Sequence, residues 1–97
     1  MMKYLLVEDE RFAYEEIKRM MQALRADYQM IGWAESVEQA VGFLKQGNID
    51  LMIVDIRLSD GISFEIFEQC PIEIPVIFTT AYDEYALKAF KVNSIDY

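Results

Sequence analysis

Histidine is absent from this 97-residue chain, and cysteine occurs only once, at Cys70. The lack of histidine excludes catalysis by an imidazole group and metal binding by an imidazole group within the chain. A single cysteine cannot form an internal disulfide bond, and this fits the reducing environment of the cytoplasm. We therefore expect a cytoplasmic protein in which Cys70, next to Pro71, is an inert packing residue.

Basic residues and long apolar runs are also scarce. Nine lysines and arginines stand against seventeen aspartates and glutamates, which gives a net charge of −8. Such an acidic surface repels phosphate backbones, so we expect no direct contact with nucleic acid. No apolar run is long enough to span a bilayer, and no signal-peptide pattern begins the chain, so we expect no membrane contact. A Gly-rich phosphate loop is lacking too, and nucleotide binding is not supported.

Apolar residues make up 54% of the chain, which at this length predicts one folded domain rather than disorder. Short apolar segments alternate with amphipathic ones. We expect strands at 3–7, 29–34, 49–54 and 75–79 and the start of a fifth at 95–97, with helices at about 10–24, 36–47, 63–69 and 83–93. This alternation predicts an α/β fold, a doubly wound parallel sheet with helices on both faces.

Two of the expected helices have clear local signals. Apolar residues at spacings of three, four and seven form one stripe on the first helix, consisting of Ala13, Ile17, Met20, Met21 and Leu24. Ser36 followed by Gln39 is a capping-box pattern at the start of the second helix, and Gly47 with Asn48 ends that helix.

Carboxylates and hydroxyls follow the strands at the point where each strand ends. Glu8, Asp9 and Glu10 follow the first strand, Asp55 follows the apolar run at 51–54, and Thr80 follows the strand at 75–79. Because the carboxyl ends of parallel strands meet at one edge of a sheet, we expect Glu8, Asp9, Asp55 and Thr80 to converge. Crowded carboxylates ionise together only when a cation shares the site, and oxygen ligands suit Mg²⁺.

Simpler interpretations exist for these acidic residues. Glu8 and Glu10 precede a helix, where the positive end of the helix dipole favours anions, and for Glu10 we prefer this interpretation. Asp55 could be a loop aspartate that caps the turn after its strand.

Four motifs occur together in this order and point to one family. They are Leu6-Val7-Glu8-Asp9-Glu10, Val54-Asp55-Ile56-Arg57-Leu58-Ser59-Asp60-Gly61, Thr79-Thr80-Ala81 and the aromatic Tyr97. The whole chain resembles the receiver domain of a bacterial two-component response regulator, and segments 78–90 and 95–97 resemble the LytTR-type sub-family. This resemblance implies a flavodoxin-like sheet of strand order 2-1-3-4-5.

The resemblance also implies roles for individual residues. Asp55 is the expected phosphoacceptor, and Asp9 is expected to bind Mg²⁺ directly. Receivers often carry aspartate at the position of Glu8, so the longer glutamate binds the ion either directly or through water. The backbone carbonyl of Arg57 completes the metal ligands, and Thr80 contacts the phosphoryl group.

Expectations for two further residues follow from the resemblance and from the strand pattern. Tyr97 is the expected switch aromatic, which changes rotamer together with Thr80, although an ordinary half-buried strand tyrosine fits the sequence equally well. Thr79 is expected to face the sheet, because neighbours on a strand alternate.

The sequence departs from the family at its end. The usual lysine lies three residues beyond the position of Tyr97, and the last helix of the fold would follow it. We therefore interpret residues 1–97 as a C-terminally truncated receiver with an incomplete fifth strand and no last helix. The stripe on the first helix then lacks part of its cover, and we expect self-association.

The implied function is that of a phosphorylation switch. A sensor histidine kinase donates the phosphoryl group, and the switch acts on an output domain outside this chain, expected to bind DNA and regulate transcription. The chain catalyses only its own phosphorylation and dephosphorylation. The alternatives are a receiver-like interaction module independent of phosphorylation and a Mg²⁺-dependent phosphatase. The phosphatase is disfavoured because such enzymes carry a second aspartate where this chain has Arg57.

Overall fold

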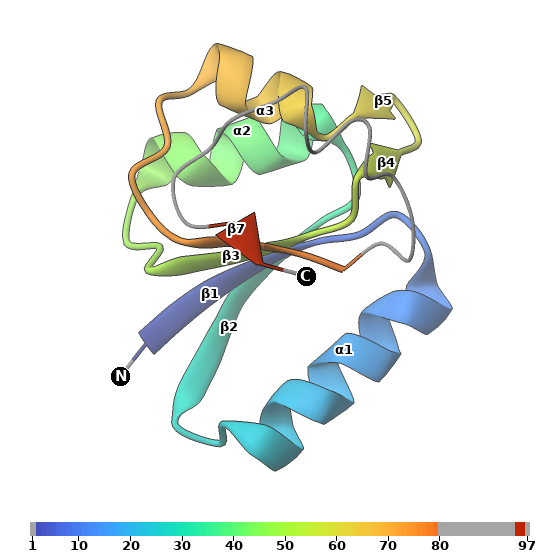
Figure 1. The fold of residues 1–97 in the computed structure, drawn as a ribbon, viewed down its shortest axis with the longest axis vertical. Coiled ribbons are helices and arrows are strands. Elements are labelled where there is room, and N and C mark those ends of the chain that lie inside the picture. The colour runs from blue at the N-terminus through green and yellow to red at the C-terminus, as the bar shows by residue number, and fades with distance from the viewer. Residues whose placement is uncertain (1, 80–94, 97) are drawn as a thin grey trace.

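The computed structural model describes residues 2–79 and 95–96, which form a parallel sheet between two layers of helix. The sheet has the order β2-β1-β3-β6-β7, and α1 covers one face while α2 and α3 cover the other (Figure 1). The strands of this sheet are β1 (Met2–Val7), β2 (Tyr28–Ala34), β3 (Leu51–Val54), β6 (Val76–Phe78) and β7 (Ile95–Asp96). Since β6 and β7 are its fourth and fifth strands, the predicted flavodoxin-like order 2-1-3-4-5 is confirmed.

The helices also match the sequence pattern within the described residues. They are α1 (Arg11–Leu24), α2 (Val37–Gln46) and α3 (Phe64–Gln69). None of the helices in the described ranges combines the length and the apolar character that a bilayer crossing requires. The predicted helix at 83–93 lies outside the described residues.

A small hairpin after β3 was not predicted as strand. β4 (Arg57–Leu58) pairs antiparallel with β5 (Gly61–Ile62), and Ser59 and Asp60 form the connection between them. The sequence indicated only turn residues here, because two-residue strands are too short to show an alternating pattern.

Each face of the sheet has its own apolar core. Leu5, Val7, Met52 and Val54 point toward α2 and α3, and Tyr4, Leu6, Leu51 and Ile53 cluster on the α1 face. All four residues of β3 are buried, as expected for the central strand of a parallel sheet. This strand therefore provides a rigid support for the residue that follows it.

Gly32 allows α2 to lie close against β2. A Cβ atom at this position would come within 2.5 Å of the Phe43 ring, which lies on α2. The β1–β2 register also shifts here, from Tyr4 opposite Met30 to Leu5 opposite Gly32. The small residue that weakened the strand pattern is thus needed for packing between helix and sheet.

The start of α2 is capped by its own residues and by the hairpin. The Ser36 hydroxyl accepts a hydrogen bond from the Gln39 N–H at 3.1 Å, as the capping-box pattern predicted. The Asp60 carboxylate accepts from the N–H groups of Val37 at 2.9 Å and Glu38 at 3.4 Å. The β4–β5 hairpin is therefore tied to the first turn of α2.

The predicted apolar stripe of α1 is covered only in part. Ile17 and Met21 pack against the core on the α1 face. Met20 and Leu24 remain 52% and 74% exposed, and Phe12 is 70% exposed. This helix therefore leaves an apolar surface open to solvent in the described part of the chain.

Candidate metal centre

The acidic residues lie where β1 and β3 end at the carboxyl edge of the sheet. The Glu8 N–H donates to the Ala34 carbonyl at 2.9 Å, and the Asp55 N–H donates to the Val7 carbonyl at 2.9 Å. Each of these bonds continues the ladder between strands by one residue. The backbone of Glu8 and of Asp55 is therefore fixed by the sheet itself.

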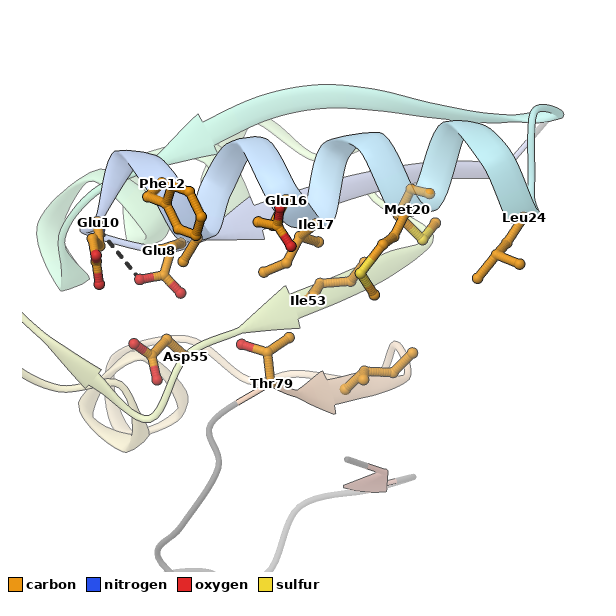
Figure 2. Close-up of a pocket in the computed structure, with 13 residues that line it drawn as sticks. Glu8, Glu10, Phe12, Glu16, Ile17, Met20, Leu24, Ile53, Asp55 and Thr79 are labelled. Atoms are coloured by element: carbon orange, nitrogen blue, oxygen red, sulfur yellow. Dashed lines mark hydrogen bonds between the residues drawn. The ribbon is translucent and has the colours of Figure 1, made fainter.

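Three carboxylates predicted to converge do so. Glu8, Asp9 and Asp55 each place a carboxylate oxygen within 4.8 Å of the others. Glu8 is buried, Asp55 is half-buried and Asp9 is exposed. Figure 2 shows Glu8 and Asp55 on the same side of the sheet, near the start of α1. The cluster is thus open to solvent on the side of Asp9.

The carboxyl group of Glu8 has a raised pKa. Burial raises the pKa of its carboxyl to about 7, and the nearby charges of Asp55 and Asp9 act in the same direction. The Glu10 N–H, which donates to Glu8 Oε1 at 3.2 Å, partly offsets this effect by favouring the ionised form. Without a cation, burial and the neighbouring carboxylates therefore favour the protonated form of Glu8.

This arrangement fits a small divalent cation. Carboxylate oxygens are the ligands that Mg²⁺ prefers, and Mg²⁺ is usually held by one or two carboxylates while it keeps several waters. A cation at the cluster would offset the repulsion that raises the pKa of Glu8. The donor set of Glu8, Asp9 and Asp55 is therefore suited to Mg²⁺.

Glu10 has a different environment from its neighbours. It is the N-cap residue of α1, as the sequence suggested, but its side chain makes no capping hydrogen bond. Its backbone N–H instead orients the Glu8 carboxylate, as the dashed line in Figure 2 shows. Glu10 thus acts on the site through its main chain.

Of the remaining residues with a predicted role or position at the site, only Arg57 and Thr79 lie within the described part of the chain. Arg57 lies on β4, two residues beyond Asp55, and a role for its carbonyl stays a prediction. Thr80 and Tyr97 lie outside the described residues, so their roles also stay predictions. Thr79, which was expected to face the sheet, is exposed and lines the same groove as Asp55 (Figure 2). That expectation was wrong, because Thr79 follows the last residue of β6 and its side chain is exposed beside Asp55.

Two residues near the site were given no role at the acidic cluster from the sequence. Asp60 connects the hairpin that follows Asp55 to α2. Trp33 donates from its indole Nε1 to the Glu8 carbonyl at 2.6 Å. A turn residue and a strand tryptophan have common structural roles, so neither carried a sequence signal for the acidic cluster.

A groove runs from the acidic cluster along α1. It has a volume of about 680 Å³ and extends from Glu8, Asp55 and Thr79 to the exposed side chains of Met20 and Leu24 (Figure 2). Its inner end is acidic and its outer end is apolar. The carboxylates of Glu8 and Asp55 are thus accessible from the side of the sheet that α1 covers.

Known proteins match this chain along nearly its whole length. Residues 4–97 match the response regulator receiver domain family. The sensory transduction protein LytT of Bacillus cereus is 39% identical over 100 residues, which cover 100% of this chain and 40% of that protein. LytR of Streptococcus agalactiae is 38% identical over 100 residues, covering 99% of this chain and 41% of that protein. The chain thus spans about two-fifths of the length of these relatives.

A solved structure agrees with the fold. The crystal structure of the response regulator protein TrrA from Thermotoga maritima, in complex with Mg(2+)-BeF, aligns with a TM-score of 0.80 at 27% identity. The alignment covers 99% of this chain and 85% of TrrA. The strand order, the acidic cluster and these matches agree, and the chain therefore belongs to the family of response regulator receiver domains of two-component systems.

Proposed function

We propose that this receiver accepts a phosphoryl group on Asp55 in the presence of Mg²⁺ and thereby switches an output domain. The observation that carries the proposal is the convergence of Glu8, Asp9 and Asp55 within 4.8 Å at the end of the most buried strand. A nucleophile for phosphoryl transfer needs a fixed position and a partner for the charge that develops. The sheet supplies the first requirement, and the acidic cluster can hold the cation that supplies the second.

Asp55 is the nucleophile in this scheme. One of its carboxylate oxygens forms a bond to the phosphorus of a phosphohistidine, and the phosphorus–nitrogen bond breaks. The electron pair of that bond stays on the imidazole nitrogen, which takes up a proton from solvent. The product on this chain is an acyl phosphate at Asp55, and no other substrate is turned over.

Glu8 and Asp9 hold the metal in this scheme. When Mg²⁺ is bound, it offsets the negative charge of the carboxylates and of the transferring phosphoryl oxygens. Glu8 must be ionised to contribute, and the Glu10 N–H favours that form. Asp9 lies on the exposed side of the cluster, where the ion would enter with its waters.

The comparison with TrrA supports the metal assignment. TrrA forms a complex with Mg(2+)-BeF, and its fold aligns with 99% of this chain. Since the described carboxylates of this chain suit the same type of cation, we infer that Mg²⁺ is the ion here as well.

The family and the length of the relatives support the proposed partners. The donor is a sensor histidine kinase, and the reader of the phosphorylated state is an output domain that binds DNA and regulates transcription in the cytoplasm. LytT and LytR are about two and a half times as long as this chain, which leaves room for such a domain. In the proposed switch, Thr80 contacts the phosphoryl group and Tyr97 changes rotamer with it.

Incubation with acetyl phosphate tests the proposal. The intact mass should increase by one phosphoryl group when Mg²⁺ is present, and neither EDTA-treated protein nor Asp55→Asn should gain mass. Asp50→Asn is a matched control, because Asp50 lies at the opposite end of β3. Mass gain that survives Asp55→Asn contradicts the site, and no gain under any condition favours a receiver-like interaction module that works without phosphorylation.

A further inference from the structure

Trp33 lies on the edge strand of the sheet, beside the acidic cluster. It pairs with Leu6 in the β1–β2 register, and Leu6 belongs to the core on the α1 face. Paired residues of neighbouring strands share a face, so the indole ring also lies on the α1 face. The ring is half-buried there.

The indole N–H is used to hold the backbone of Glu8. Nε1 donates to the Glu8 carbonyl oxygen at 2.6 Å, while the Glu8 N–H donates to the carbonyl of Ala34 at 2.9 Å. Trp33 and Ala34, which are adjacent on β2, therefore form hydrogen bonds to the carbonyl and to the N–H of Glu8, respectively. The strand ladder alone would fix only the N–H, because β1 ends at Val7.

The ring itself is held in place by α1. Tyr14 stacks on Trp33 with ring centroids 3.8 Å apart and an angle of 10° between the planes. The Tyr14 N–H in turn donates to the Glu10 carbonyl at 3.0 Å, in the first turn of the helix. The segment Glu8–Glu10 is thus held at its start by Trp33 and at its end by the helix that stacks on Trp33.

We propose that Trp33 is a positioning residue of the acidic cluster, which fixes the Glu8 main chain so that Glu8 and Asp9 are pre-arranged for the cation. This inference rests on the proposed function for its metal, but the fixed position of the segment Glu8–Glu10 is a property of the metal-free protein. A tryptophan that served packing alone would need only its ring, and the indole N–H could point to solvent. Here the N–H satisfies a carbonyl of the residue that carries a ligand.

Removal of the indole N–H tests the proposal. Trp33→Phe keeps an aromatic ring for Tyr14 and removes the donor to Glu8. We expect Mg²⁺ binding, measured by calorimetry with the metal alone, to weaken about tenfold, the lower end of the range for groups that orient metal ligands. Tyr14→Phe is the matched control, because it keeps the stack and has no hydrogen bond to Glu8, and its affinity should change less than about twofold.

A second variant changes fewer atoms. Trp33 is the only tryptophan in the chain, so expression with benzothienylalanine in place of tryptophan alters this position alone. This analogue has sulfur where indole has N–H and keeps nearly the same shape. The analogue-substituted protein replaces the Trp33→Phe variant if that variant fails to fold, and it should weaken Mg²⁺ binding by the same factor.

A metal-free measurement separates this inference from the proposed function. In EDTA, amide hydrogen exchange at Asp9 and Glu10 should be faster in the analogue-substituted protein than in the wild type, while exchange in β3 stays the same. If the wild type binds no Mg²⁺, the proposed function fails, and faster exchange at Asp9 and Glu10 still supports positioning by Trp33. Unchanged exchange, or a loss of thermal stability with unchanged Mg²⁺ affinity, would show that Trp33 only packs and would overturn the inference.

Discussion

Replacing Glu8 with glutamine should stabilise the metal-free protein above pH 7 and weaken its binding of Mg²⁺. Glutamine has nearly the same shape and keeps an oxygen that can accept from the Glu10 N–H, which now binds Glu8 Oε1 at 3.2 Å. It removes the negative charge that burial and the neighbouring carboxylates disfavour. The same charge is needed to hold the cation, so stability and metal binding change in opposite directions.

The size of the effect follows from the pKa of Glu8. Its pKa is raised from 4.5 to about 7 in the folded protein. Between these values the folded state binds more protons than the unfolded state, so stability falls as pH rises and the loss is complete above pH 7. The full shift corresponds to ~3 kcal/mol, and access of water from the open side of the cluster reduces this to about 1 to 2 kcal/mol. Below pH 4.5 Glu8 is neutral in both states and contributes no such penalty.

Thermal unfolding in EDTA at pH 5 and at pH 8 measures this effect. Glu8→Gln should raise Tm only slightly at pH 5, where the carboxyl of the folded wild type is still protonated and only the unfolded state is ionised, and should raise Tm at pH 8 by about 4 to 8 °C for each kcal/mol gained. Glu10→Gln is the control, since the Glu10 side chain is exposed and makes no capping bond. Addition of Mg²⁺ should stabilise the wild type more than Glu8→Gln. A variant that is equally destabilised at both pH values would refute the reasoning.

Other substitutions test the cluster and its supports. Asp9→Asn should weaken Mg²⁺ binding far more than Glu10→Gln does, as measured by titration of Mg²⁺ against NMR amide shifts. Equal losses of affinity in the two variants would show that the set of metal ligands is wrong. Asp60→Ala should lower the free energy of unfolding by about 1 to 2 kcal/mol in urea, because two N–H groups of α2 lose their acceptor, whereas Asp60→Asn should cost less. The exposed apolar surface of α1 should cause self-association, and light scattering coupled to size exclusion should show it decrease in the double variant Met20→Glu and Leu24→Glu. A monomer at high concentration would contradict this expectation.

The order of the strands and the place of the acidic residues were predictable because strong periodic signals carry them. The apolar run of β3 ends at Asp55, and the parallel arrangement brings that end to the side of Glu8. The Ser36 cap and the end of α2 at Gly47 were predictable from local residue patterns. These features depend on neighbours in sequence or on a single rule about sheet edges.

The features that were not predicted depend on contacts between distant segments. Trp33 reaches a carbonyl 25 positions earlier in the chain, and Asp60 caps a helix 22 to 23 positions earlier. Thr79 is exposed and lines the groove beside Asp55, whereas the sequence had predicted that it would face the sheet. The raised pKa of Glu8 likewise arises from burial and from charges on two segments, which no local motif reveals.

The most direct test of the account is to locate the phosphoryl group on the wild-type chain. After reaction with acetyl phosphate, proteolysis and tandem mass spectrometry should find it on Asp55 alone, in samples that contain Mg²⁺ and not in samples that contain EDTA. This result is expected because Asp55 ends the fixed central strand beside the only carboxylate cluster of this kind in the described residues. A phosphoryl group on another residue, or labelling of Asp55 that is independent of Mg²⁺, would contradict the account.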